Sequence, residues 1–114
     1  MPLVDVSYDP AVSDVDLARL AKLLPDLVAA AVDCPEEPWL GPAEVGDIEI
    51  RFREKSRHDV GDLTVVIEVR TKWMASRLDD PQRRADVVRD GLSALNLEPI
   101  GVWLILAEGA WSQT

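Results

Sequence analysis

The first residues that could do chemistry stand at the very start of the chain, which reads MPLVDVSY. Pro2 gives a strand no hydrogen-bond donor, so it can be simple punctuation at a strand's first position. If Met1 is removed, the same residue becomes a secondary amine at the amino terminus, a group that can take up and release a proton. Both roles, architecture and acid–base chemistry, are open for Pro2 at this point.

Other residue types that often carry chemistry are scarce. Cys34 and His58 are the only cysteine and histidine, which excludes an internal disulfide framework and a multi-histidine or thiolate metal site. A His-based triad is disfavoured for the same reason. His58 and Asp59 are adjacent, and because adjacent side chains point apart, we interpret them as a solvent-exposed loop pair.

Four cations lie within or at the end of two strand-like segments. Arg51 and Arg53 alternate with apolar residues and stand between two glutamates, so a solvated strand face is the simplest interpretation and an anion-binding role the alternative. Arg70 and Lys72 lie at the end of the next strand. For them too, surface charge is the simplest interpretation and an anion site is the alternative.

Composition narrows the class of partner. The chain has 114 residues and a net charge of −9, so we expect one domain, residues 1–114, with no nucleic acid and no membrane as partner. A small anionic ligand stays compatible with this charge, because a local arginine cluster can act within an acidic protein. With no signal-like leader and no apolar run long enough for a bilayer, a cytoplasmic protein is the default expectation.

In the first half of the chain, the expected strand begins directly after Pro2. Residues 3–8 alternate as a half-buried strand, and Ser13 offers a cap for a helix through residue 32. Pro25 inside this segment predicts a kink near Leu24 or two abutting helices. The stretch from 34 to 46 holds three prolines and two glycines, which indicates a loop.

The second half repeats the order of elements. The first half ends with a strand over 48–53, and the second half is expected to hold strands over 63–70 and 100–106, with a helix that begins at Pro81. The second and third strands most simply form a hairpin with a long connection, and Arg83 and Arg84 fall on the wet face of the helix. The fold class is therefore α+β, in the order β-α-β-β-α-β, from two right-handed crossover halves, 2–54 and 63–108. A four-stranded sheet with two helices on one face follows.

The four tryptophans are the oddest feature of the composition. Trp103 lies inside an apolar strand and is most simply a core residue. Trp39, Trp73 and Trp111 lie in loop or terminal segments, where large rings pack well against a partner subunit or line a pocket. We interpret these three as interface or pocket walls, with an interface favoured.

Four stretches together resemble the tautomerase superfamily, which includes 4-oxalocrotonate tautomerase, macrophage migration inhibitory factor and 5-carboxymethyl-2-hydroxymuconate isomerase. They are MPLVDVSY, the helix DLARLAKLLPDLVAAAV with its internal proline, the helix entry ASRLDDPQRRADVV, and the ending LAEGAWSQ. The middle two look nearest to the carboxymethyl-hydroxymuconate isomerase branch. Two departures stand beside them: SYDPAVSD lacks the early arginine of some short members, and Glu49 stands where the second strand of others begins with arginine.

The resemblance implies a homotrimer and a cofactor-independent keto–enol tautomerase, an isomerase that uses neither metal nor cofactor. Pro2, freed by removal of Met1, would be the general acid and base for a small 2-oxo or 2-hydroxy acid. Arg51 or Arg53 would bind the substrate carboxylate, and Trp111, or Trp103, would supply an apolar wall. The alternative is a non-catalytic oligomeric interaction module on the same fold, in which the tryptophans mediate assembly.

Overall fold

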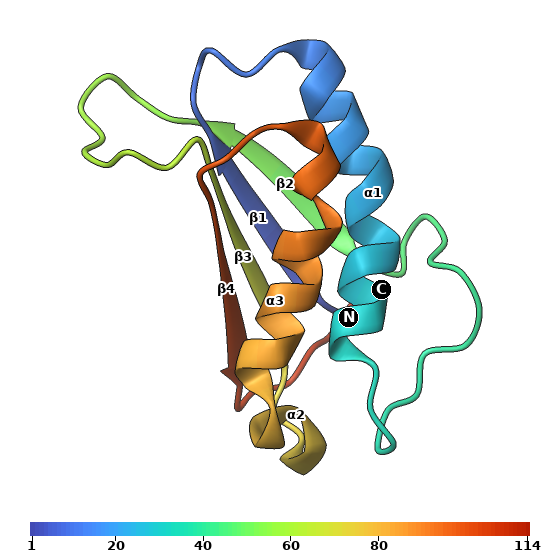
Figure 1. Ribbon diagram of the computed structural model, residues 1–114. Helices are drawn as coiled ribbons and strands as arrows, with labels where there is room; N and C mark the ends of the chain where they lie inside the picture. The colour runs from blue at the N-terminus through green and yellow to red at the C-terminus, as the bar shows by residue number, and fades with distance from the viewer.

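The computed structural model describes residues 1–114 and contains the expected order of major elements (Figure 1). The elements are β1 (Leu3–Tyr8), α1 (Asp14–Val32), β2 (Glu49–Glu54), β3 (Val65–Lys72), α2 (Ala75–Asp79), α3 (Pro81–Gly91), a 3-10 turn (Ser93–Leu95) and β4 (Ile100–Ala107). The short helix α2 was not predicted, because its five residues are too few to show a periodic pattern. No helix is long and apolar enough to span a bilayer.

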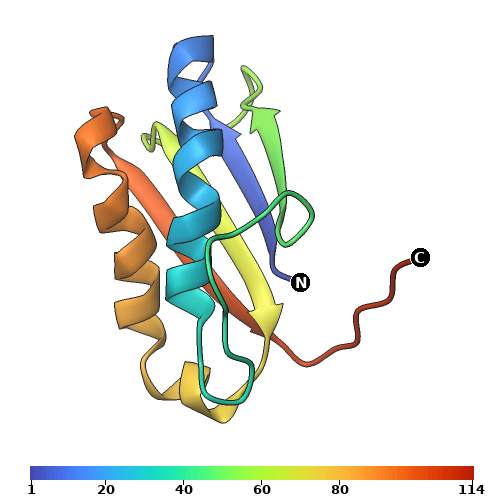
Figure 2. The same ribbon diagram turned by 90° about the vertical axis from the view of Figure 1, so that its right-hand side faces the viewer.

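The four strands form one mixed sheet in the order β2-β1-β3-β4. The outer pairs, β1 with β2 and β3 with β4, are parallel, and the central pair, β1 with β3, is antiparallel. Both long helices, α1 and α3, cover the same face of this sheet, and the other face is open (Figures 1 and 2). The predicted fold class, an α+β protein with a four-stranded sheet and two helices on one face, is confirmed.

The predicted hairpin of the second and third strands is wrong, because β1 lies between β2 and β3. Each half is a parallel crossover, so the two halves meet through their first strands. The central strands are apolar on the helix side: Val4 and Val6 on β1 and Ile67 on β3 are fully buried or nearly so. By contrast β2 reads EIRFRE, and a strand with four charges in six residues suits an exposed edge.

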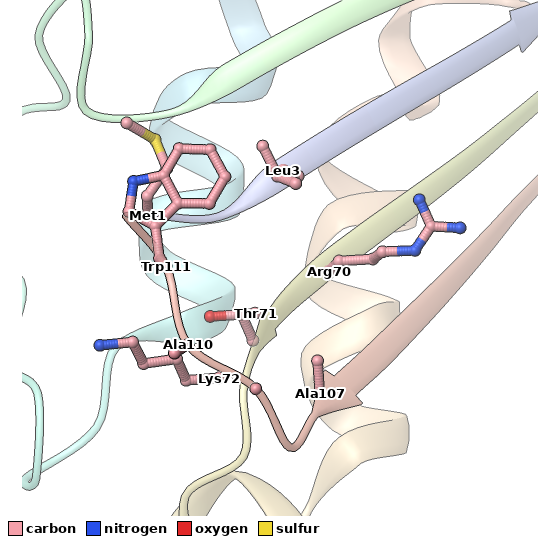
Figure 3. Close-up of a pocket in the computed structure, with 9 residues that line it drawn as sticks. Met1, Leu3, Arg70, Thr71, Lys72, Ala107, Ala110 and Trp111 are labelled. Carbon is pink, nitrogen blue, oxygen red and sulfur yellow. The ribbon is translucent and has the colours of Figure 1, made fainter. Parts of the chain in front are cut away.

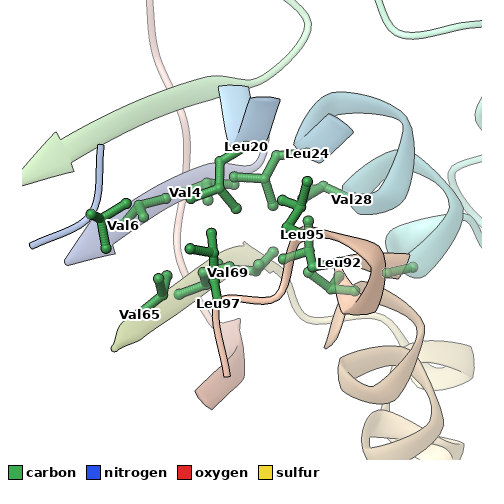
Figure 4. Close-up of a cluster of buried hydrophobic side chains, with 14 of the residues drawn as sticks. Val4, Val6, Leu20, Leu24, Val28, Val65, Val69, Leu92, Leu95 and Leu97 are labelled. Atoms are coloured by element: carbon green, nitrogen blue, oxygen red, sulfur yellow. The ribbon is translucent and has the colours of Figure 1, made fainter. Parts of the chain in front are cut away.

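The core lies between the helices and the covered face of the sheet (Figure 4). In α1 the buried residues Leu20, Leu24 and Val28 recur at helical spacing and pack against the central strands. The helix runs unbroken from Asp14 to Val32 through Pro25, so the alternative of two abutting helices is wrong. Ser13 caps it as predicted, with its Oγ accepting a hydrogen bond from the Asp16 amide at 3.2 Å.

The carboxyl end of α1 has no basic residue of its own, and buried arginines from other elements bind its last carbonyls. Arg84 of α3 donates to the carbonyls of Ala31 and Asp33 at 2.9 and 2.7 Å, and Arg77 of α2 donates to that of Val32 at 2.8 Å. Placing Arg84 on the wet face was therefore wrong: it is only 5% exposed, because the free carbonyls of α1 lie within its reach.

Trp103 is not a core residue either. It is 68% exposed, because it points to the open face of the sheet from the edge strand β4. Trp39 packs against the core, while Trp73 and Trp111 are 44% and 45% exposed.

Candidate active site

An open cavity of about 190 Å³ lies where β1 begins and β3 ends (Figure 3). Antiparallel pairing puts Leu3 opposite Arg70, so the start of the chain and the end of β3 meet there. The end of β4 leads into the tail, which folds back until the indole of Trp111 lies beside Met1. The lining is largely apolar, and its charged residues are Arg70 and Lys72.

A second cavity of about 300 Å³ lies on the other side of the amino terminus. It is lined by Met1, Pro2, Glu37, Pro38, Trp39, Leu40 and Asp47. Pro2 itself is buried, and its carbonyl accepts a hydrogen bond from the Glu49 amide at 3.2 Å, which joins it to the sheet just before β1 and β2 pair. Met1 lines both cavities, whereas Pro2 lines only the second and its neighbour Leu3 only the first.

The two cations of the first cavity are held differently. The Arg70 guanidinium pairs with Asp5 at 3.0 Å and with Glu68 at 2.9 Å, and it points along the open face of the sheet, away from Trp111 (Figure 3). The Lys72 ammonium lies 4.0 Å from a carboxylate oxygen of Glu37. The other oxygen of Glu37 accepts from the buried Arg77 at 3.3 Å, so Lys72 is the more loosely held cation.

The loop that carries Glu37 is fixed by its neighbour, Glu36. The Glu36 carboxylate accepts a hydrogen bond from the Ser76 amide, at the start of α2, at 3.0 Å. The hydrogen bonds from the Ser76 amide and hydroxyl lower the pKa of Glu36 from 4.5 to about 2, because both favour the charged carboxylate. A charged Glu36 thus ties this loop to the element that follows Lys72.

Likeness to known proteins is found in structure alone: neither protein-family models nor curated sequences match the chain. Among solved structures, FG41 malonate semialdehyde decarboxylase inhibited by 3-bromopropiolate superposes with a TM-score of 0.66 at 15% identity, over 96% of this chain and 87% of that one. A fused 4-OT symmetric trimer gives 0.63 at 15%, over 92% and 85%. A 5-carboxymethyl-2-hydroxymuconate isomerase from Deinococcus radiodurans R1 gives 0.60 at 15%, over 98% and 88%.

The chain has the tautomerase fold. The resemblance noted from four short stretches of sequence is thereby confirmed as a likeness of fold over nearly the whole chain.

Within this tautomerase fold, one of the predicted substrate-binding residues reaches the cavity beside the amino terminus. Trp111 does so, as part of its wall. Arg51 and Arg53 do not: Arg51 pairs with Asp5 at 3.2 Å, and Arg53 lines a polar depression of about 200 Å³ farther along the open face. Arg51 stands in register with Asp5, three residues beyond Pro2, or about 10 Å at the usual rise of a strand.

Arg70 and Lys72, ranked as surface charge, are the cations that a single chain brings to this cavity. The correct strand order would have identified these two residues as neighbours of the amino terminus. A hairpin of the second and third strands would keep them apart from Pro2, whereas the antiparallel pairing of β1 and β3 puts the end of β3 beside residue 3. No group of His, Cys, Asp and Glu side chains in the structure could hold a metal ion.

Proposed function

We propose that this chain is a tautomerase-type isomerase that moves a proton on a small 2-oxo or 2-hydroxy acid, with the amine of Pro2 as general acid and base after removal of Met1. The observation that carries the proposal is the place of Pro2. It is a buried residue in the wall of one cavity, between Met1 and Leu3, which both line the neighbouring cavity with Lys72 and Arg70 in its wall.

Removal of Met1 would do two things at once. It would turn the Pro2 amide nitrogen into a secondary amine, and it would take away a residue that lines both cavities. The amine would then accept a proton from the carbon next to the substrate's carbonyl, so that a C–H bond breaks, an N–H bond forms and an enolate develops. Return of the proton to another carbon of the conjugated system completes the shift, without metal or cofactor.

The surroundings of Pro2 suit an amine that must be unprotonated in part near neutral pH. Burial would disfavour the charged form of this amine, and the cations Arg70 and Lys72 of the neighbouring cavity would act in the same direction. Glu37 and Asp47, in the wall of the second cavity, act in the opposite direction. Glu37 is already paired with Arg77 and lies near Lys72, so much of its charge is compensated.

The carboxylate of the substrate would be bound by Lys72 and by Arg70, once Arg70 turns from its ion pairs. Trp111 would form the apolar wall for the conjugated chain. Arg51 and Arg53 stay candidates for anion binding through a neighbouring subunit, because we also propose a homotrimer. One of the solved structures with this fold is a fused 4-OT trimer, which supports assembly of this kind.

The proposal is tested on the purified protein in two steps. Intact mass first decides whether Met1 has been removed, and a protein that keeps Met1 in the cell cannot use Pro2 as a base. The processed protein is then incubated with 3-bromopropiolate, which inhibits a protein of this fold. We expect one adduct per chain, located at Pro2, and loss of 2-hydroxydienoate ketonisation by at least 100-fold in Pro2→Ala.

The rival function, a non-catalytic interaction module, makes the opposite prediction in the same assay. A processed protein that forms no adduct and ketonises no 2-hydroxydienoate contradicts the enzyme proposal and favours the module. The exposed Trp103 is the observation that keeps this rival in view, since large exposed rings are typical of interfaces.

A further inference from the structure

The two cavities beside the amino terminus have charges of opposite sign in their walls. The first is lined by the cations Arg70 and Lys72 and by no acidic residue. The second, of about 300 Å³, is lined by the anions Glu37 and Asp47 and by no lysine or arginine. The rest of its wall is apolar and includes Trp39, which packs against the core. A ligand that reaches from the first cavity into the second would therefore meet a positive and then a negative field.

Asp47 brings the less compensated of the two negative charges. One of its carboxylate oxygens accepts a hydrogen bond from the Glu44 amide at 2.8 Å, and the Asp47 amide donates to the Glu44 carbonyl at 3.0 Å. These contacts fix the side chain in a turn, and its carboxylate takes part in no ion pair. Two residues later, the Glu49 amide donates to the Pro2 carbonyl at 3.2 Å. The turn that carries this charge is thus attached directly to Pro2.

Glu37 is held in the same wall by the buried Arg77. The guanidinium of Arg77 donates to the Glu37 carboxylate at 3.3 Å and to the carbonyls of Val32 and Lys72 at 2.8 and 3.0 Å. Arg77 is 1% exposed, whereas 39% of the Glu37 side chain is exposed. The Glu37 carboxylate is therefore fixed in place while it still faces solvent. Because the Lys72 ammonium also lies 4.0 Å away, the charge of Glu37 is partly compensated.

We propose that the substrate of this chain carries a single carboxylate, and that Asp47 and Glu37 are specificity-determining residues that disfavour a second one. The proposal rests on the function proposed above and names its substrate class, a 2-oxo or 2-hydroxy monocarboxylic acid with an uncharged distal end. The carboxylate would bind at Lys72 in the first cavity, and the distal end would lie against Trp39 in the second. A second carboxylate there would face fixed negative charges with no free cation to pair with, which weakens binding of the wrong acid.

The competing explanation is that the second cavity selects by size or apolarity alone. Salt separates the two explanations, because repulsion between exposed charges is screened as the Debye length falls from about 10 Å at 0.1 M to about 3 Å at 1 M salt. Selection by size does not respond to salt in this way. Salt also weakens binding of the first carboxylate, but it does so for every acid compared, so a ratio of two affinities reports on the distal end.

The test compares two six-carbon acids that differ only at the distal end. Hexa-2,4-dienoate ends in a methyl group, and hexa-2,4-dienedioate ends in a second carboxylate. Neither has the 2-hydroxy group of a tautomerase substrate, so calorimetric titration of the purified protein measures binding without turnover. We expect the parent to bind the monoacid at least about ten-fold more tightly at low salt, since two exposed charges contribute up to about five-fold each. At about 1 M salt the ratio should fall by at least about three-fold.

Three variants assign this ratio to the named charge. Asp47→Asn keeps an acceptor for the Glu44 amide but removes the charge, and it should lower the ratio by at least about three-fold at low salt. Asp47→Glu keeps the charge and should keep the preference. Glu44→Gln is the matched control, because its exposed carboxylate lines neither cavity, and it should leave the ratio unchanged.

Glu37→Gln should lower the ratio as well, and further when combined with Asp47→Asn. Its effect on Lys72 acts on the first carboxylate of both acids and cancels in the ratio. Because Glu37 also binds the buried Arg77, this variant can lose stability, and Asp47→Asn then decides the test alone.

Every other outcome overturns the inference. Equal affinities in the parent, or a preference for the diacid, would show that the negative wall does not discriminate. A preference that stays unchanged in Asp47→Asn and at high salt would assign the selection to size or apolarity. Failure of both acids to bind would show that the two cavities do not hold such an acid. Labelling of Pro2 by 3-bromopropiolate depends on neither acid, so it reports on the proposed chemistry separately.

Discussion

Lys72 and Arg70 line the same cavity, but their cationic groups are held by ion pairs of unequal strength. The Lys72 ammonium lies 4.0 Å from Glu37 and its side chain is 46% exposed, whereas Arg70 is bound by Asp5 and Glu68 at 3.0 and 2.9 Å. A substrate carboxylate would have to compete with two ion pairs for Arg70 but with one long contact for Lys72. Lys72 is therefore the first cation that an acid would meet.

We predict that Lys72→Gln raises the KM for a 2-hydroxydienoate by about ten-fold or more, since a hydrogen bond to a charged group contributes roughly 1.5–3 kcal/mol. The measurement is steady-state kinetics on the processed protein. Lys22→Gln, on the exposed face of α1, removes the same charge far from the cavity and should keep the KM of the parent. Equal KM values for both variants would remove Lys72 from substrate binding.

A second prediction at this scale concerns Glu36, whose pKa is lowered to about 2 by hydrogen bonds from Ser76. Because the folded-state pKa lies below the ordinary value of 4.5, Glu36 stabilises the fold fully above pH 4.5. That contribution is lost as the pH falls toward 2. The melting temperature should fall less steeply across this window in Glu36→Gln than in the parent. Glu44→Gln, whose exposed carboxylate accepts no hydrogen bond, should keep the parent slope.

At the scale of elements, the last backbone carbonyls of α1 accept hydrogen bonds from a side chain of α3. Arg83 and Arg84 both bind Asp80, at 2.6 Å each, and hold its pKa below the usual range, Arg84 more strongly. They differ in burial, since the side chain of Arg83 is 65% exposed and that of Arg84 6%. Only Arg84 continues inward to the carbonyls at the end of α1.

Arg84→Met should therefore lower the free energy of unfolding by about 3 kcal/mol, because it leaves buried carbonyls without a donor and Asp80 without its inner partner. Arg83→Met is the matched control and should change it by less than about 1 kcal/mol, as is usual for exposed ion pairs. Urea unfolding followed by circular dichroism measures both. Similar losses in the two variants would show that the carbonyl contacts contribute little.

Local pattern predicted the elements better than their arrangement. The alternation of residues 3–8 and the proline at the start of α3 are properties of short segments, and both elements were confirmed at these places. The place of β1 between β2 and β3 depends on how two crossovers meet, which no short segment records. Arg84 and Trp103 were misplaced for the same reason: their burial is decided by a partner element, not by their own neighbours in sequence.

At the scale of the whole molecule, the open face of the sheet and its two edges are the surfaces through which copies of the chain could assemble. The open face carries the ion-paired chain Arg51–Asp5–Arg70–Glu68 across three strands, which suits contact with water rather than a dry interface. An assembly through the edges of the sheet would cover the uncharged strand β4 and leave this charged face in contact with water. The charged open face is therefore compatible with an assembly in which another chain covers β4.

Such an assembly makes stability depend on concentration. If three folded chains bind one another and the unfolded chains do not, a ten-fold dilution weakens each subunit by about 0.9 kcal/mol, two thirds of the tenfold increment. For a chain of this size that is a fall in melting temperature of about 4 °C. We expect this shift in scanning calorimetry of the parent protein. A melting temperature that stays constant on dilution in the parent would show that the chain folds without its copies.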